Sequence, residues 1–99
     1  MNDKFYAMIG LAKRAGAVRS GEDTVKKSIR QSGAKLVVIA CDASDNTKKS
    51  IKNSCEYYKV RYIETGTMAR LGRSIGNDVR AVIAIENPNL AEAVLKQSE

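Results

Sequence analysis

The residues best suited to chemistry lie close together in the first third of the chain, around Gly21. Val25 and Ile29 follow it four residues apart, the spacing of two side chains on the buried face of a helix. That spacing turns four polar side chains onto one outer face at the helix start: Ser20, Asp23, Lys27 and Arg30. Unpaired backbone N–H groups, a glycine that allows close approach and nearby cations suit contacts with phosphates and base edges. The same residues also fit an ordinary capped surface helix.

A second group of candidates lies in the glycine-bounded segment from Gly72 to Arg80. If this segment is a loop before a late strand, Asn77 and Arg80 can lie against the same ligand as the glycine turn. A plain connection between a helix and a strand would have much the same composition. A weaker candidate is a run of three lysines, which usually marks only a solvated helix face: Lys48, Lys49 and Lys52.

The charge of the chain makes nucleic acid the first partner to test. Its 99 residues carry 17 Lys and Arg against 11 Asp and Glu, a formal net charge of +6. A clustered positive face releases condensed counterions from a phosphate backbone, which drives binding. A basic charge that only keeps the protein soluble remains an alternative.

Most kinds of catalysis lack the residues they need. The chain has no His, and Cys41 and Cys55 are too far apart for a CxxC metal site, so zinc, a Ser-His-Asp triad and His-based acid/base chemistry are excluded. We interpret both cysteines as small buried hydrophobes. Neither standard phosphate-binding glycine loop is present. The remaining enzymatic alternative is a magnesium site at Asp42 and Glu86, which follow two apolar strands. We therefore expect no enzyme, no cofactor and no bound metal.

Hydrophobic periodicity predicts helices that alternate with short strands. The first helix is expected at residues 2–15, the second runs to about Gln31, a short one covers 67–75, and extended segments cover 17–19, 36–41, 60–63 and 81–85. A further helix should face inward with three residues, Ile51, Cys55 and Tyr58. The last helix should bury Leu90, Ala91, Val94 and Leu95.

Polar residues mark where several helices begin. Ser20 and Asp23 have the spacing of a reciprocal capping box. Ser44 or Asp42 can cap the third helix, and Asn87 before a proline is a typical start for the last one.

Alternation of this kind predicts the α/β class, a three-layer α-β-α sandwich with a mixed sheet of about four strands. The continuous apolar run 36–41 should be a central strand. With no linker or low-complexity tract, residues 1–99 should form a single domain. The longest apolar run is far shorter than the roughly 20 residues that span a bilayer, and the first residues show no signal-peptide pattern, so we expect a cytoplasmic monomer.

Six segments, taken in order, resemble one family across nearly the whole chain: GLAKRAG, SGEDTVKKSI, KLVVIACDAS, NTKKSI, CEYYKV and LGRSIGNDVRAVIAI. Together they are similar to the kink-turn RNA-binding ribosomal proteins, the family of L7Ae and L30e, and above all to its short bacterial members. The α-β-α sandwich of that family agrees with the fold expected above.

The resemblance implies binding at a sharply kinked RNA, whose tandem sheared G·A pairs expose guanine edges to the start of the second helix. The family motif there is G-x-N-E-x-x-K, in which Gly21 matches the glycine and Lys27 the lysine. Asp23 stands where the family has Asn, and Thr24 where it has Glu. An ionised carboxylate accepts hydrogen bonds but cannot donate them. In the family, the loop that corresponds to residues 77–80 packs on a flipped-out nucleotide, where Arg80 could stack or pair with phosphate.

The sequence thus predicts a protein that binds structured, kink-turn-like RNA, as part of or beside ribosomal or other ribonucleoprotein particles. The alternative is a protein–protein adaptor that kept the fold after losing strict RNA recognition. The residues expected to contact RNA are Arg19, Ser20, Gly21, Asp23, Thr24, Lys27, Arg30, Lys48, Asn77 and Arg80.

Overall fold

Helices and strands alternate along the chain as the hydrophobic pattern predicts. A computed structural model describes residues 3–99. The elements are α1 (Asp3–Arg14), β1 (Val18–Ser20), α2 (Glu22–Arg30), β2 (Leu36–Ile39), α3 (Asp45–Tyr58), β3 (Tyr62–Glu64), α4 (Met68–Ser74), β4 (Val82–Ile85) and α5 (Pro88–Gln97). The predicted elements all occur, and their ends differ by one to a few residues; the start of the first helix at residue 2 lies outside the described residues.

One mixed sheet forms the middle of the molecule, with strand order β1-β4-β2-β3. β2 pairs in parallel with β3 and antiparallel with β4, and β1 pairs antiparallel with β4 at one edge. Every residue of β2 and β4 is buried, because both faces of these inner strands are covered. The predicted mixed four-stranded sheet, with the strand that begins at Leu36 in its centre, is therefore confirmed.

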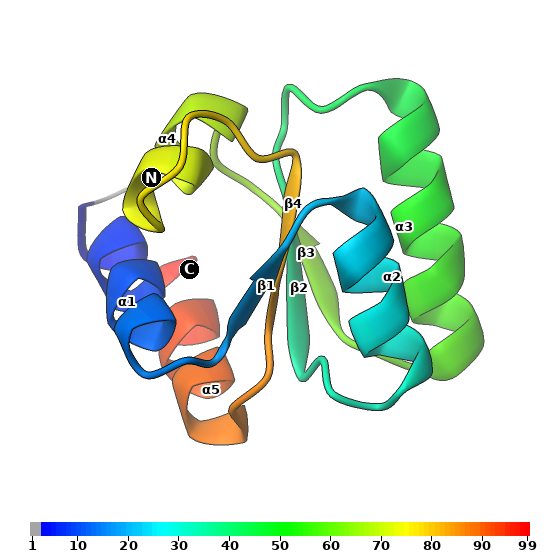
Figure 1. The fold of residues 1–99 in the computed structure, drawn as a ribbon, viewed down its shortest axis with the longest axis horizontal. Coiled ribbons are helices and arrows are strands. Elements are labelled where there is room, and N and C mark those ends of the chain that lie inside the picture. The colour runs from blue at the N-terminus through cyan, green and yellow to red at the C-terminus, as the bar shows by residue number, and fades with distance from the viewer. Residues whose placement is uncertain (1–2) are drawn as a thin grey trace.

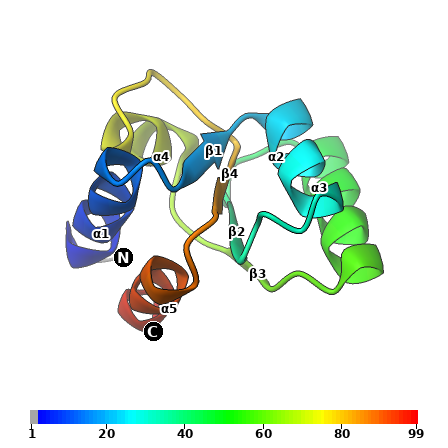
Figure 2. The same ribbon diagram turned by 60° about the horizontal axis from the view of Figure 1, so that its bottom comes forward.

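Helices cover the two faces of the sheet unequally. Figure 1 shows α2 and α3 side by side on one face, and α1, α4 and α5 on the other; Figure 2 shows the same division from a second direction. Contacts between α2 and α3, α1 and α5, and α1 and α4 complete each layer. This is the predicted three-layer α-β-α sandwich. No helix among residues 3–99 is long and apolar enough to cross a membrane.

The helix starts show which capping predictions were right. Ser44 Oγ accepts from the Thr47 amide at 3.2 Å, and Asn87 Oδ1 accepts from the Leu90 amide at 3.0 Å, so both predicted caps are confirmed. Asp42 does not cap α3. Its carboxylate accepts instead from the Met68 amide, at 2.8 Å, at the start of α4.

The capping box predicted from Ser20 and Asp23 was wrong. The residue that precedes α2 is Gly21, and no side chain caps the helix there. Its backbone, at φ 91° and ψ 151°, lies in a region that L-residues rarely adopt. The chain therefore enters α2 through a glycine turn, and the Ser20 hydroxyl is left to bond elsewhere.

Two predictions of burial on and near α3 were also wrong. Ile51 and Cys55 are fully buried as expected, whereas Tyr58 lies at the exposed end of the helix. Cys41 is exposed, because β2 ends at Ile39 and Cys41 belongs to the turn that follows. Burial raises the pKa of the Cys55 thiol to about 11, with a smaller contribution from Glu56, so Cys55 alone is the buried hydrophobe that we expected.

Candidate nucleic-acid interface

The glycine turn before α2 is held by backbone bonds on both sides. The Gly21 amide donates to the Val82 carbonyl at 3.2 Å, which ties the turn to β4, and the Gly21 carbonyl accepts from the Val25 amide at 2.9 Å. A Cβ built on Gly21 would meet no atom within 4 Å. The turn therefore presents bare, accessible backbone at the N-terminal end of α2, where the helix amides favour negative charge.

The loop before β4 meets this turn through one side-chain contact. Arg80 Nε donates to Ser20 Oγ at 3.2 Å, although the two residues are 60 positions apart. The Arg80 amide also donates to the Met68 carbonyl at 3.0 Å, and its Nη1 donates to the Val79 carbonyl at 2.7 Å. The two segments that the sequence marked as candidates thus form one continuous surface.

Close packing against α4 fixes the position of this loop. A Cβ on Gly72 would lie 2.6 Å from the Asp78 carbonyl oxygen and 2.8 Å from the Val79 Cα, so only glycine lets the loop approach the helix this closely. The Asn77 amide donates to the Gly72 carbonyl at 2.8 Å. Asn77 is half-buried by this arrangement, whereas Asp78 and Val79 remain exposed.

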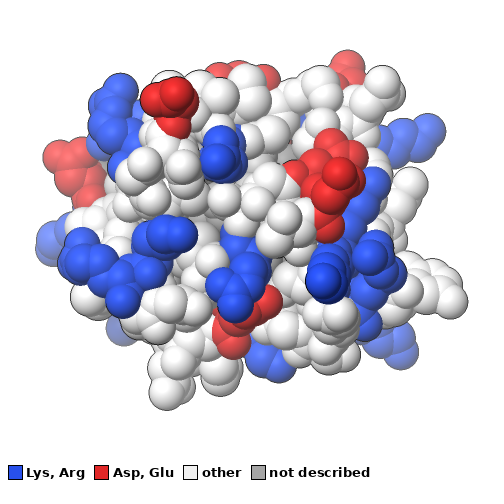
Figure 3. All heavy atoms as spheres, in the orientation of Figure 1, with Lys and Arg blue, Asp and Glu red and all other residues white. Residues whose placement is uncertain are grey.

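The outer face of α2 carries the polar side chains that the spacing predicted. Asp23, Thr24, Lys27 and Arg30 are all exposed, while Val25 and Ile29 are fully buried. Within residues 3–99, no carboxylate forms an ion pair with Lys27 or Arg30. Figure 3 shows carboxylates over the start of α2 and basic groups further along the same helix. The positive charge of α2 is therefore available to a ligand, but acidic groups lie beside it.

One of those carboxylates, Glu22, is engaged by a hydrogen bond from α3 and an ion pair within α2. Thr47 Oγ1 donates to Glu22 Oε1 at 2.9 Å, and Lys26 Nζ lies 3.3 Å from Glu22 Oε2. Glu22 is thus tied to the neighbouring helix and to its own helix. Asp23 has no such partner among the described residues, so its carboxylate is exposed and unpaired at this end.

Two predicted contact residues are engaged within the protein. Arg19 Nη2 lies 3.4 Å from Glu86 Oε1, and the other oxygen of Glu86 accepts from the buried Ser28 hydroxyl at 2.6 Å. Lys48 Nζ lies 3.0 Å from Glu64, which also binds Lys52 at 2.7 Å. Hydrogen bonds from Lys52 and then Lys48 hold the pKa of Glu64 below its usual value, so this carboxylate stays ionised and offsets the lysine charge.

The structure therefore gathers most, but not all, of the predicted residues. The residues that meet at one end of the sandwich, or lie on the adjoining face of α2, are Ser20, Gly21, Asp23, Thr24, Lys27, Arg30, Asn77 and Arg80. Arg19 instead pairs with Glu86, and Lys48 with Glu64. Val79 lies in the predicted loop 77–80 but was not named among the contact residues, and it is 53% exposed between Asp78 and Arg80. An isolated apolar residue in the polar run from Gly76 to Arg80 was the signal that could have found it.

The alternative magnesium site does not form. β2 and β4 are antiparallel, with Ile39 opposite Val82 and Leu36 opposite Ile85, so the residues that lead to Asp42 and Glu86 leave the sheet at opposite ends of the strands. Across residues 3–99, no three His, Cys, Asp or Glu side chains are grouped so that they could hold a metal ion.

The fold and this interface define a class: a small α/β sandwich that presents a glycine turn, a helix start and a cation-bearing loop at one end. The chain belongs to the ribosomal protein L7Ae/L30e/S12e/Gadd45 family, whose model matches residues 3–95. This membership agrees with the prediction that the chain is a binding protein rather than an enzyme.

Relatives and solved structures cover almost the whole chain. It is 45% identical over 92 residues to the RNA-binding protein YlxQ of Bacillus subtilis, covering 93% of this chain and 92% of that one. It is 39% identical over 84 residues to YlxQ of Enterococcus faecium, covering 85% and 82%. A Bacillus halodurans protein of unknown function superposes with a TM-score of 0.91 at 29% identity, over 96% of both chains. The 15.5 kD RNA-binding protein of Giardia lamblia, with a TM-score of 0.79, 23% identity and coverage of 97% and 86%, shares the fold.

Proposed function

We propose that this protein binds structured RNA with a sharp kink, through the start of α2 and the loop before β4. The observation that carries the proposal is the bond from Arg80 to Ser20, at 3.2 Å, which joins the loop to the glycine turn. The two segments therefore adjoin, so that one ligand can contact both. The names of the two YlxQ relatives, both RNA-binding proteins, support the same class of ligand.

Each part of this surface has a distinct role in the proposal. Gly21 lets the RNA backbone approach closely, because no side chain covers the turn. The free amides at the start of α2 and the ammonium of Lys27 contact guanine edges or phosphates. Arg80 and the exposed Val79 contact a base that has left the stack. These contacts depend on the kinked shape of the RNA, which a straight duplex lacks.

Asp23 sets the specificity of the proposed site. Its carboxylate is exposed and has no partner among the described residues, so it can accept a hydrogen bond from a guanine N–H donor. It repels phosphates, which restricts the RNAs that fit. Asp23→Asn should therefore bind a kinked RNA more tightly while keeping the preference for the kink.

The experiment that tests the proposal compares two RNAs of equal length, one with a kink-turn and one a straight duplex, across a salt series. We expect saturable binding that is tighter for the kinked RNA at every salt concentration. Equal, weak and steeply salt-dependent binding to both would overturn the proposal, because it would reflect charge without recognition of shape.

Lys27→Ala tests the site itself. The loss of one cation from a phosphate contact should weaken binding of the kinked RNA and reduce the salt slope by about one. Lys96→Ala, which removes an exposed lysine from α5, serves as the matched control and should leave the slope almost unchanged. An unchanged affinity in Lys27→Ala would remove Lys27 from the interface.

We further propose that the protein acts in the cytoplasm, as a single domain and a monomer, beside ribosomal or other ribonucleoprotein particles. Co-sedimentation of the protein with ribosomal particles would support this placement if nuclease treatment abolishes the co-sedimentation. The exposed Asp23 also favours a second candidate, a protein–protein adaptor. Co-purification of a protein that survives nuclease treatment, without binding of kinked RNA, would favour the adaptor.

A further inference from the structure

A second surface lies at the opposite end of the sandwich, away from the glycine turn. α2 and α3 both begin near the proposed interface and run toward this end, as Figure 1 shows. There the end of α3, the segment after α2 and the start of α5 come together around a hollow of about 520 Å³. A hollow of this size can hold a nucleobase or a small side chain.

Two tyrosines at the end of α3 are the most unusual feature of this surface. Tyr57 is 78% exposed and Tyr58 is 42% exposed, and their ring centroids lie 4.8 Å apart at an interplanar angle of 75°. The other two tyrosines are engaged: Tyr6 is buried and Tyr62 donates its hydroxyl to Glu56 at 2.8 Å. Because Tyr57 is 78% exposed and touches Tyr58 in an edge-to-face contact, much of its ring is accessible to a ligand.

The hollow beside Tyr58 combines an apolar floor with a cationic rim. Its floor includes Ala34, Val60 and Ala91, which are buried or half-buried. Its rim carries three cations and one carboxylate, Glu92. Arg61 pairs with Glu92 at 2.8 Å, and Lys35 donates to the Ser32 carbonyl at 3.1 Å, whereas Lys59 forms no ion pair within residues 3–99. A neutral, flat group would fit the floor while a phosphate would fit the rim.

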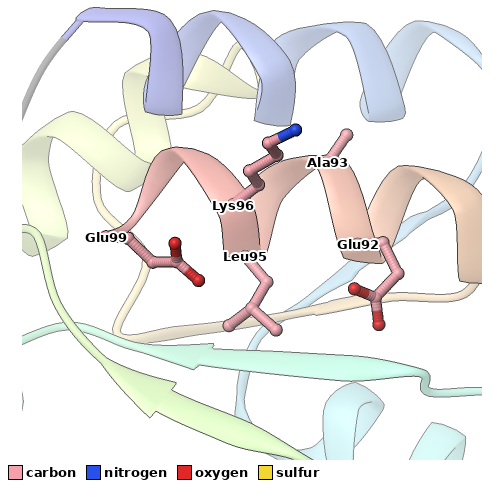
Figure 4. Close-up of a pocket in the computed structure, with 5 residues that line it drawn as sticks. All are labelled: Glu92, Ala93, Leu95, Lys96 and Glu99. Atoms are coloured by element: carbon pink, nitrogen blue, oxygen red, sulfur yellow. The ribbon is translucent and has the colours of Figure 1, made fainter.

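A neighbouring hollow lacks this combination. Figure 4 shows Glu92 and Glu99 on either side of Leu95 on α5, with Lys96 pointing away toward α1. Its charged groups do not converge on one point, and two of the three are negative. The cationic hollow beside the tyrosines is therefore the better binding surface at this end.

We propose that the surface formed by Tyr57, Tyr58, Lys59 and the adjoining hollow binds single-stranded RNA. One base stacks on the open ring of Tyr57, a second enters the hollow beside Tyr58, and the phosphate between them contacts Lys59 and Lys35. Stacking on an aromatic ring needs no particular base, because every base has a π-face. Unpaired cations beside exposed aromatic rings favour RNA over an apolar peptide, since a chain with net charge +6 already attracts phosphate.

The test measures binding of a labelled, unstructured pyrimidine RNA about ten nucleotides long at low salt, by fluorescence anisotropy. Tyr57→Leu, which keeps an apolar side chain but removes the ring, should weaken binding about fivefold or more, and Tyr57→Phe should restore it. Lys59→Asn, which suits the left-handed backbone at φ 60°, should reduce the salt slope by about 0.7. Lys96→Ala is again the matched charge control.

Two results would overturn the inference. One is equal affinity of Tyr57→Leu and the wild type for the single strand. The other is no binding by the wild type, which would leave the tyrosines to a protein partner. The kinked RNA without single-stranded ends, measured in parallel, reports only on the glycine turn. Loss of single-strand binding at the tyrosines can therefore be distinguished from loss of kinked-RNA binding at the glycine turn.

Discussion

At the scale of single residues, Gly21 has the most demanding backbone conformation of the interface. Its φ of 91° and ψ of 151° lie in a region of backbone conformation that is allowed essentially only for glycine, while the space around it is open. A side chain at position 21 would therefore strain the backbone without clashing with any neighbouring atom.

Gly21→Ala should destabilise the fold by about 1–3 kcal/mol through backbone strain alone. The free energy of unfolding from urea titration measures this, with an unchanged m-value as the sign that the unfolded state is unaffected. Thr24→Ala is the matched control, because Thr24 is exposed and its side chain has no hydrogen-bond partner among the described residues. Equal stability of Gly21→Ala and Thr24→Ala would mean that the turn relaxes to another conformation at no cost.

The residue scale is also where sequence reasoning was least reliable. The spacing of Ser20 and Asp23 fits a capping box, and nothing local in the sequence reveals that Gly21 takes a conformation that prevents one. The Ser20 hydroxyl bonds instead to Arg80, a partner 60 residues away. Contacts of this range depend on how strands pair, so a window of local sequence cannot predict them.

At the scale of elements, helix and strand order could be predicted because burial leaves a regular pattern. Val25 and Ile29, and the runs that form β2 and β4, are fully buried as expected. The relative direction of β2 and β4 could not be predicted from the sequence, and the magnesium hypothesis was wrong for this reason. Asp42 and Glu86 each follow an apolar strand, but β2 and β4 run antiparallel and carry them apart. β1, three residues long, pairs antiparallel with β4 at one edge of the sheet.

The packing of the loop on α4 leads to a prediction at this scale. Gly72→Ala would place a Cβ 2.6 Å from the backbone oxygen of Asp78, so the loop must shift away from the helix. Overpacking of this kind costs about 1–3 kcal/mol. The shift should also break the bond between Arg80 and Ser20, weaken binding of the kinked RNA, and change the amide NMR signals of residues 77–80.

A second glycine-to-alanine change provides the comparison. Gly10 also lies in a helix, and its Cβ would be 3.2 Å from the Ser74 carbonyl oxygen, a much milder contact. Alanine gains about 0.5–1 kcal/mol over glycine in a helix interior, which offsets part of that contact. If Gly72→Ala and Gly10→Ala leave the loop signals and RNA binding equally unchanged, the loop position does not depend on Gly72.

At the scale of the whole molecule, basic groups are spread over the face in Figure 3 rather than gathered in one patch, and the two proposed RNA surfaces lie at opposite ends of the sandwich. The net charge of +6 includes lysines whose charge a neighbouring carboxylate offsets, such as Lys48 and Lys52 beside Glu64. Among residues 3–99, the cations without ion pairs include Lys27, in the last turn of α2, and Lys59, directly after α3. α3 separates these ends; its 14 residues correspond to about 20 Å along the helix axis.

Two binding surfaces at this separation predict a dependence on RNA length. A kinked RNA with a single-stranded tail should gain affinity only when the tail can reach from the glycine turn to Tyr57, because the second contact then becomes intramolecular. Below that length the tail should add little; above it, affinity should rise by about tenfold or more and then fall slowly as the tail lengthens. Titrations with tails extended one nucleotide at a time measure this threshold.

The dependence of affinity on tail length distinguishes specific binding of the tail at Tyr57 from general electrostatic attraction. A tail held only by the general positive field would strengthen binding steadily from its first nucleotide, because each added phosphate releases counterions. A tail held at Tyr57 gives a threshold, and Tyr57→Leu should abolish the rise while leaving affinity for the tailless kinked RNA unchanged. A steady rise that persists in Tyr57→Leu would show that the two ends act independently, and that one RNA does not bridge them.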